Sequence, residues 1–201
     1  MKICKVKQGS PAWHKLRIGK VTGSRLKQLM SSDNLSLLDI LVAEQVTGVS
    51  EDSDYVSDDM QRGTDLEPVA RKEYEKRTKK KVKLVGFAIH DDYPMFGFSP
   101  DGFVGRSGAV EFKCPNTKSH VKTIRRNTIP VQYLHQALCY FLINKSVEWL
   151  DFVSYDPRFE VKPIHIIRVT RDDLKEELEE VNEGLRKFFS RFDTIRDSII
   201  F

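Results

Sequence analysis

The chain has 201 residues, of which 40% are hydrophobic and 31% charged, and its formal net charge is +4 at pH 7. The longest apolar run, residues 137–143, is far too short to span a bilayer, which argues against a membrane protein. The three cysteines show no zinc-like spacing, and no apolar segment follows the N-terminal lysines. We therefore expect a reduced, cytoplasmic protein without a signal peptide, folded as a single domain over residues 1–201.

Positive charge is concentrated in two stretches rather than spread evenly. Acidic residues gather elsewhere, at 51–59 and 172–183, so one face of the protein can be much more positive than the total suggests. Such a face suits a polyanionic partner such as nucleic acid. The basic stretches contain Lys79, Lys80, Lys81 and Lys83, and then Lys118, Lys122, Arg125 and Arg126.

The first third of the chain has the apolar spacing of helices. Thr22 and Ser24 are candidate N-caps of the first helix, and Gly48 is a candidate C-cap of the second. The acidic, Ser-rich stretch 49–58 predicts a loop. The helices are expected within residues 13–30, 35–48 and 60–80.

From residue 81 onward, the apolar pattern changes to the alternation that is typical of strands. Three strands are expected first, then a short basic helix, an apolar helix that opens at Pro130, two more strands and a long final helix. This order predicts an α/β fold with a central mixed sheet flanked by α-helices. The strands are expected at 81–91, 96–101, 108–114, 148–156 and 163–170, and the helices at 117–127, 130–144 and from 172 onward.

The stretch "FSPDGFVGRSGAVEFKCP" carries the clearest chemical signal. Side chains of a strand alternate between its faces, so Glu111 and Lys113 point the same way while Phe112 points into the core. If this strand forms a hairpin with the one before it, Asp101 approaches Glu111. Two adjacent carboxylates repel each other unless a hard cation such as Mg²⁺ or Mn²⁺ lies between them, and a nearby lysine can orient a metal-bound water. These groups suit metal-assisted hydrolysis of a phosphodiester.

The same residues also have a plainer interpretation, because a Glu-x-Lys on a strand is usually a solvated ion pair. Glu160-Val161-Lys162 repeats the pattern near another strand, without a preceding Pro-Asp and without another candidate ligand nearby. Spacing alone therefore leaves a metal site and a solvated pair equally open at Asp101, Glu111 and Lys113.

Further stretches extend the pattern along the chain. Pro100-Asp101 followed by Glu111-x-Lys113 matches the PD-(D/E)xK nuclease signature, and "SPDG…G…VEFKCP" resembles the lambda exonuclease branch, the YqaJ-like viral recombinases. The resemblance extends from about residue 8 to about residue 158 and implies a restriction-endonuclease-like core. The other matching motifs, in the family's order, are "QGSPAWHKLRIGKVTGS", "RGTDLEPVARKEYE", "VQYLHQALCYF" and "YDPR".

The resemblance implies roles for individual residues. Asp101 and Glu111 would hold the metal with help from the carbonyl of Phe112. Lys113 would position the attacking water. Glu67 would complete the acidic set, directly or through metal-bound water. The residues that match those holding the 5′-phosphate of a DNA end are Arg17, Ser24 and Ser99, with Gln136 facing the same pocket.

The proposed phosphate ligands also have ordinary structural interpretations. Arg17 can bind phosphate in a bidentate manner, or it can be a plain surface residue. Ser24 can mark a helix start whose N–H groups bind an anion, or it can be a simple N-cap. Gln136 lies in an apolar helix, where a structural hydrogen bond is the rival role. Trp13 either packs in the core or supports Arg17.

The function implied by the resemblance is a Mg²⁺-dependent 5′→3′ exonuclease that acts on double-stranded DNA ends. It would release mononucleotides, leave 3′ overhangs and work with a single-strand annealing protein in phage-type recombination. An endonuclease of the same fold is one alternative, although it would have no use for a 5′-phosphate pocket. A non-catalytic DNA-binding domain is the other, and it is disfavoured because carboxylates in a DNA groove weaken binding unless a metal compensates them.

The last helix bears on assembly, because its apolar residues alternate steps of four and three. Such a stripe most often covers the protein's own core, but the apolar end Ile199, Ile200 and Phe201 suits a subunit contact. Because the exonuclease that the chain resembles is a ring-shaped trimer, we expect a homotrimer with a central channel. The stripe comprises Leu174, Leu178, Val181, Leu185, Phe188, Phe192, Ile195 and Ile199.

Overall fold

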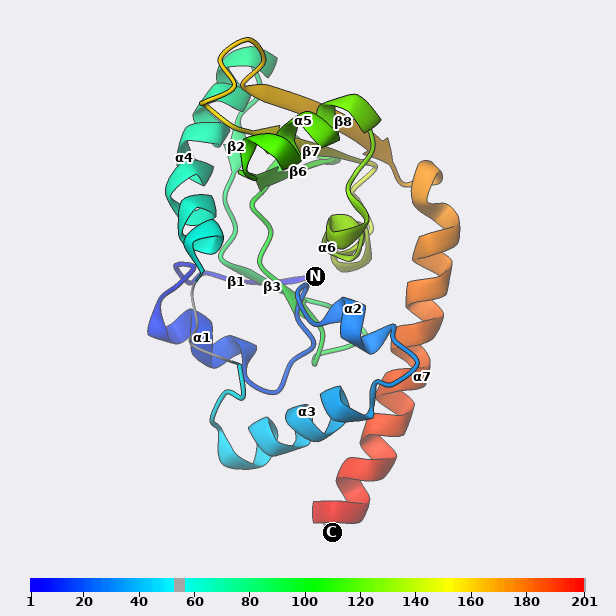
Figure 1. Ribbon diagram of the computed structural model, residues 1–201. Coiled ribbons are helices and arrows are strands. Elements are labelled where there is room, and N and C mark those ends of the chain that lie inside the picture. The colour runs from blue at the N-terminus through cyan, green and yellow to red at the C-terminus, as the bar shows by residue number, and fades with distance from the viewer. Residues whose placement is uncertain (53–56, 201) are drawn as a thin grey trace.

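The computed structural model describes residues 1–52 and 57–200, which form a mixed α/β fold around a five-stranded sheet (Figure 1). The strand order is β2-β5-β6-β7-β8; β6 and β7 run parallel, and all other neighbours are antiparallel. The expected mixed sheet flanked by helices is therefore confirmed. The strands are β2 Val82–Lys83, β5 Gly102–Val104, β6 Gly108–Lys113, β7 Trp149–Tyr155 and β8 Ile164–Thr170.

A second, antiparallel sheet has the order β1-β3-β4, with β1 Lys2–Cys4, β3 Phe87–Ile89 and β4 Gly97–Phe98. The single strand expected over 81–91 is thus wrong, because its two ends, β2 and β3, belong to different sheets. The break lies at Gly86, where an added Cβ would be only 1.8 Å from the carbonyl oxygen of Val6. Close backbone approach of this kind requires glycine and interrupts the ladder.

The expected hairpin between 96–101 and 109–114 is also wrong in its pairing. Strand β4 pairs with β3 in the small sheet, whereas β6 pairs with β5, with Phe103 opposite Ala109. The chain therefore leaves one sheet and enters the other between β4 and β5. Asp101 lies at this junction, one residue before β5 begins.

Seven α-helices and one 3₁₀ turn are present in the described residues. Gly48 ends α3 with a φ of 68°, as expected, and Ser57 caps α4, which begins at Asp58 within the stretch predicted to be a loop. The rest of that stretch has no helix or strand at residues 49–52, and residues 53–56 lie outside the described part of the chain. The helices are α1 Pro11–Arg17, α2 Leu26–Leu29, α3 Leu35–Thr47, α4 Asp58–Thr78, α5 Thr117–Arg126, α6 Val131–Ile143 and α7 Lys175–Ile200, with η1 at Asp172–Leu174.

Thr22 and Ser24 do not cap α2, contrary to expectation. The residue at the N-cap is Arg25, which makes no side-chain capping bond, and the N–H groups of Arg25 and Leu26 donate to the backbone carbonyl of Thr22. The hydroxyl groups of Thr22 and Ser24 are therefore not used to start the helix.

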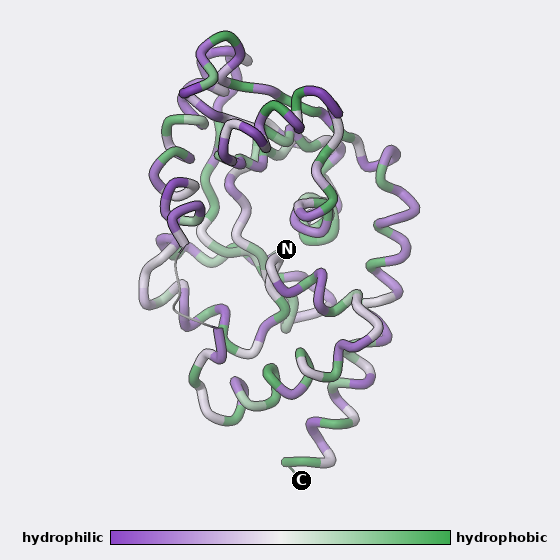
Figure 2. The backbone as a smooth tube through the Cα atoms, viewed as in Figure 1, coloured by the Kyte–Doolittle hydropathy of each residue, from purple (hydrophilic) through white to green (hydrophobic). Residues whose placement is uncertain are grey.

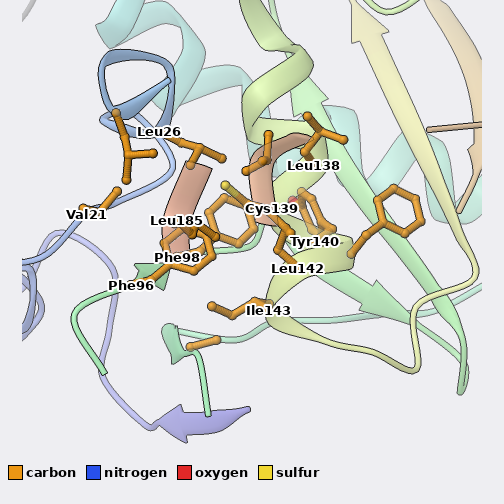
Figure 3. Close-up of a cluster of buried hydrophobic side chains, with 14 of the residues drawn as sticks. Val21, Leu26, Phe96, Phe98, Leu138, Cys139, Tyr140, Leu142, Ile143 and Leu185 are labelled. Atoms are coloured by element: carbon orange, nitrogen blue, oxygen red, sulfur yellow. The ribbon is translucent and has the colours of Figure 1, made fainter. Parts of the chain in front are cut away.

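Helices cover both faces of the large sheet. On one face, Ala70 and Tyr74 of α4 pack with Val110 and Phe112 of β6. On the other face lies the central helix α6, seen nearly end-on in Figure 2 with both hydrophobic and hydrophilic residues, of which residues 137–143 are buried. Figure 3 shows Tyr140 and Leu138 of this helix among side chains from β4, α2 and α7. Because Glu111 lies between Val110 and Phe112 on the strand, its side chain faces α6.

The apolar stripe of α7 covers the protein's own core, as we considered most frequent for such a pattern. Leu178, Val181 and Leu185 are buried, and an added Cβ on Gly184 would lie 2.4 Å from the sulfur of Met30 near α2. Ile199, at the end of the helix, is 63% exposed, and Phe201 lies outside the described residues. None of the helices in the described part of the chain is both long and apolar enough to cross a lipid bilayer.

Candidate active site

Asp101, Glu111 and Lys113 lie close together at the open end of the β5–β6 pair, away from the turn that connects the two strands. The Nζ atom of Lys113 is 2.6 Å from Oε1 of Glu111, and the backbone N–H of Phe112 donates to Oδ2 of Asp101 at 2.7 Å. Glu111 is only 3% exposed. The structure thus brings together the acidic pair and the lysine that the sequence singled out, although through a different strand pairing from the expected one.

Tyr140 of α6 is a member of this site that the sequence analysis missed. Its Oη atom accepts a hydrogen bond from the backbone N–H of Asp101 at 2.9 Å and lies 2.5 Å from Oε2 of Glu111. Burial, and then the nearby carboxylates of Glu111 and Asp101, raise the pKa of Tyr140 well above its ordinary value, so the phenol stays a donor at neutral pH. Its position one helical turn after Gln136 was the available signal, because residues four apart share a helix face.

The site holds more negative than positive charge. Burial, and then repulsion from Glu111, raise the pKa of Asp101 well above its ordinary value. Burial and then Glu111 also raise the pKa of Glu67, which reaches the site from α4. Burial alone would lower the pKa of Lys113, but the carboxylates of Glu111 and Asp101 raise it above its ordinary value. Lys113 is therefore a cation at neutral pH, and one such cation faces three carboxyl groups.

The donor set fits a hard divalent cation. Asp101 and Glu111 supply carboxylate oxygens, which Mg²⁺ and Mn²⁺ prefer, and a cation would relieve the repulsion that raises the pKa of Asp101. Within residues 1–52 and 57–200, no group of three or more His, Cys, Asp or Glu side chains is arranged to hold a metal by itself. Two carboxylates and a backbone carbonyl such as that of Phe112 would therefore have to be completed by water or substrate oxygens.

Arg17 and Ser99 are joined by Trp13. The indole Nε1 of Trp13 donates to Oγ of Ser99 at 2.7 Å, and the guanidinium carbon of Arg17 lies 4.4 Å from the centre of the same indole. Burial lowers the pKa of Arg17, although the group remains charged. Trp13 thus supports Arg17, which was one of its two expected roles. Because Ser99 precedes Asp101 by two residues, this cluster adjoins the acidic pair.

Ser24 lies on the turn next to this cluster. Its hydroxyl forms a 2.9 Å hydrogen bond with that of Thr22, and within the described residues no hydrogen bond joins it to Arg17 or Ser99. Gly23, between the two hydroxyl residues, rests on β4, because an added Cβ would lie 2.8 Å from the ring of Phe98. The turn is therefore packed against the strand that leads into Ser99.

Gln136 has an unused acceptor. Its Oε1 atom is buried and has no hydrogen-bond partner among the described residues. The structural hydrogen bond that we considered as its rival role is therefore not made at this oxygen. Buried polar atoms are normally paired, so this side chain is available for another group.

A cavity of about 270 Å³ opens beside Lys113, between α5 and α6. Tyr133 lies on its wall, with its ring centre 5.2 Å from Nζ of Lys113 and 5.8 Å from the ring of Phe152. Lys122 and Arg126 also line the cavity. The basic stretch of α5 is thereby placed next to the lysine of the acidic site.

The second Glu-x-Lys of the chain is not part of any such arrangement. Glu160 and Lys162 lie in the exposed turn between β7 and β8, and Val161 between them is 86% exposed. This pair is solvated, which was the plainer interpretation of the pattern.

Comparison with known proteins gives one family and a consistent fold. Residues 12–145 match the model of the YqaJ-like viral recombinase domain. An alkaline exonuclease from Laribacter hongkongensis is 34% identical, with a TM-score of 0.80 over 94% of this chain and 98% of that one. Its structure in complex with dAMP gives a TM-score of 0.79 over the same shares of the two chains.

A phage-related exonuclease from Haemophilus somnus 129PT is 15% identical, with a TM-score of 0.61 over 90% of this chain and 96% of that one, which shows a shared fold alone. No curated protein matches the chain.

Proposed function

The chain belongs to the YqaJ-like viral recombinase domain family, and on that premise we propose that it is a metal-dependent exonuclease on double-stranded DNA ends. It would digest the 5′-ended strand, release mononucleotides and leave 3′ overhangs. The observation that carries the proposal is the pair of the half-buried Asp101 and the buried Glu111, with Lys113 ion-paired to Glu111, beside the Arg17–Trp13–Ser99 cluster. The similar Laribacter hongkongensis protein is an alkaline exonuclease, and its complex with dAMP supports a mononucleotide product.

At the scissile phosphate, different residues of the chain would bind the metal, orient the attacking water and stabilise the developing charge. Asp101, Glu111 and the Phe112 carbonyl would hold Mg²⁺ or Mn²⁺, which when bound supplies a Lewis acid and a reactive water. Lys113, a cation at neutral pH, would orient the attacking water and stabilise the charge that develops on the phosphate. Glu67 would add a further carboxyl group through water.

The second cluster would fix the DNA end. The Arg17 guanidinium and the hydroxyl groups of Ser24 and Ser99 are donors suited to a terminal 5′-phosphate, and Gln136 would add its amide. Because Ser99 is two residues from Asp101, a phosphate held there would place the first phosphodiester of the strand near the acidic pair. The cavity beside Lys113 would receive the following nucleotides, with Lys122 and Arg126 near their phosphates.

The proposal extends to the assembly and its partners. We expect a ring-shaped homotrimer, and the exposed apolar end of α7, with Ile199 63% and Ile200 42% exposed, supports a subunit contact there. Light scattering at micromolar concentration tests this, since a monomer would refute the ring. A single-strand annealing protein that takes the 3′ overhang is the proposed partner, and the bacterial cytoplasm is the proposed place of action.

The decisive experiment compares linear and circular duplex DNA with and without Mg²⁺, with the linear DNA labelled at either strand terminus. We expect Mg²⁺-dependent loss of the 5′ label as mononucleotide and no cleavage of the circle. Cleavage of the circle would point instead to an endonuclease of the same fold. Binding without cleavage would point to a DNA-binding domain.

A further inference from the structure

Arg25, the residue that follows Ser24, forms a buried ion pair with Glu44 of α3. The guanidinium of Arg25 donates to both oxygens of Glu44, at 2.8 and 2.6 Å, and the two side chains are only 8% and 1% exposed. Glu44 also accepts the backbone N–H groups of Gly19 at 2.7 Å and of Glu51 at 2.9 Å. One carboxylate therefore joins α3, the segment between α1 and α2, and the start of the acidic stretch.

The Arg25–Glu44 ion pair, called the anchor below, keeps both of its charges at neutral pH. Burial would raise the pKa of Glu44, but hydrogen bonds from Arg25, then from the N–H groups of Glu51 and Gly19, hold it below its ordinary value. A buried, fully hydrogen-bonded pair of this kind fixes geometry more than it adds stability. It holds the Gly19–Arg25 segment in place against α3.

Asp52 connects the anchor to the proposed phosphate pocket. Its Oδ1 atom accepts a hydrogen bond from Nη2 of Arg25 at 2.8 Å, while its Oδ2 atom lies 3.7 Å from Nη2 of Arg17. The side chain of Asp52 is 48% exposed and that of Arg17 is 21% exposed. The contact with Arg25 is a hydrogen bond, whereas the contact with Arg17 is a longer ion pair.

We propose that Asp52 limits the preference of the end-binding site for a 5′-phosphate, because it is a counter-ion for Arg17 that a terminal 5′-phosphate must replace and a 5′-hydroxyl does not. The inference rests on the proposed function of Arg17. A terminal phosphate carries about −1.5 to −2 charges at pH 7 and can bind a guanidinium through two oxygens. It outcompetes the 3.7 Å contact, and Asp52 remains on Arg25. An end with a 5′-hydroxyl offers no such charge, so Arg17 stays neutralised by Asp52.

The substitution Asp52→Asn tests this directly, because the amide oxygen can still accept the hydrogen bond from Arg25 while the competing charge is lost. A partly exposed ion pair of this type corresponds to about a two- to five-fold change in affinity. We therefore expect D52N to bind 5′-phosphorylated duplex about two- to five-fold more tightly, with a smaller change for the 5′-hydroxyl duplex. Asp52→Glu, which keeps the charge, should keep the wild-type ratio of the two affinities.

Binding is measured by fluorescence anisotropy in EDTA, so that hydrolysis plays no part, on two duplexes that differ only in the 5′ group. Glu51→Gln is the matched control, because it removes one charge at the adjacent position, where the carboxylate forms no ion pair among the described residues. An unchanged ratio of affinities in D52N, or an equal gain in E51Q, overturns the inference.

The outcome for wild type separates this inference from the function it rests on. If wild type prefers the phosphorylated end but never hydrolyses DNA, the nuclease proposal fails and the role of Asp52 is still decided by D52N. If wild type hydrolyses DNA but binds both ends equally, the Arg17 pocket and the role of Asp52 both fail while the nuclease stands. Melting temperatures of D52N and wild type should agree, because the Arg25–Glu44 pair is untouched.

Discussion

The two halves of the candidate site differ in how their charges are compensated. In the acidic half, Asp101 lies one residue before β5, Glu111 lies within β6 and is ion-paired to Lys113, and Glu67 is nearby. In the end-binding half, Arg17 and Arg25 face Glu44 and Asp52, two cations against two anions on helices and connecting segments. The first half has one cation for three carboxyl groups, whereas the charges of the second half are already balanced.

This difference predicts two kinds of dependence. If the acidic half binds a metal as proposed, the metal would allow its carboxylates to be ionised together, so activity should depend there on metal concentration and on pH. In the proposed end-binding half, a terminal phosphate would replace one anion with another, so binding there should depend on the chemical group at the DNA end. Substitutions in each half test this difference between dependence on metal and pH and dependence on the DNA end.

The largest effect is expected from the acidic half. Asp101→Ala or Lys113→Ala should lower the rate of nucleotide release from linear duplex DNA in Mg²⁺ by at least about 10²- to 10³-fold, because the first removes a proposed metal ligand and the second removes the cation proposed to stabilise the reacting phosphate. Glu160→Ala is the control, since it belongs to the solvated Glu-x-Lys in the β7–β8 turn. An inactive E160A together with an active D101A would mean that the wrong pair has been identified.

The next effect concerns the DNA end. Wild type should digest a 5′-phosphorylated duplex faster than a 5′-hydroxyl duplex, and Arg17→Ala should lose about ten- to a hundred-fold of that preference, because a charge-assisted contact disappears. The preference is measured from initial rates on the two ends. Arg106→Ala, at an exposed arginine in the β5–β6 turn, should keep it. A preference that survives in R17A would remove Arg17 from the pocket.

A third prediction separates metal support from general stability. Tyr140→Phe leaves Glu111 without its phenol partner, so the Mg²⁺ concentration needed for half-maximal rate should rise about tenfold or somewhat more. Tyr74→Phe is matched to it, because that buried phenol donates to Asp151 at 2.7 Å in the cluster on the other face of the sheet. Both variants should lose about 1–3 kcal/mol of unfolding free energy, and only Y140F should change the Mg²⁺ dependence. Equal Mg²⁺ titrations for the two would contradict a role at the metal site.

The smallest effect is thermal. Burial and Glu111 raise the pKa of Asp101 in the folded protein, so without metal this group contributes stability that is fully present below its ordinary pKa and is lost as pH rises through the raised value. Mg²⁺ binds the ionised site and should restore that loss, so its effect on the melting temperature should grow with pH, reaching a few degrees. Asp101→Asn should reduce the pH slope, of which Glu67 keeps a part because its pKa is also raised, and should abolish the Mg²⁺ shift. A Mg²⁺ shift that persists in D101N would place the metal elsewhere.

Local patterns predicted much of this molecule. Helical spacing and Gly48 predicted α3 and its end, because both depend on residues within a few positions. The spacing of Asp101, Glu111 and Lys113 predicted an acidic pair beside a lysine, because alternation along one strand fixes which side chains share a face. Here the chemistry follows from short-range geometry.

Features that depend on distant segments were missed. The strand over 81–91 is broken because Gly86 touches Val6, a contact that no local pattern contains. An arginine near a helix start is ordinarily a surface residue, but Arg25 is buried because its guanidinium is paired with the carboxylate of Glu44. Tyr140 lies in an apolar stretch of sequence that is typical of a core helix, and its hydrogen bond to Glu111 depends on the position of strand β6. In each case the deciding partner lies 19 or more residues away.

The junction at Asp101 has a consequence for the order of folding. This residue lies between a strand of the small sheet and a strand of the large one, and its backbone is fixed by Tyr140, 39 positions further along the chain, while Ser99 is fixed by Trp13, 86 positions earlier. Contacts that close long loops cost entropy before they return any energy, so they form late. We therefore expect the acidic pair to be assembled only after both sheets and α6 have docked. A nascent chain in which α6 has not yet been synthesised already contains Asp101 and Glu111 but cannot hold them in the geometry of the site. We therefore expect such a chain to have no nuclease activity.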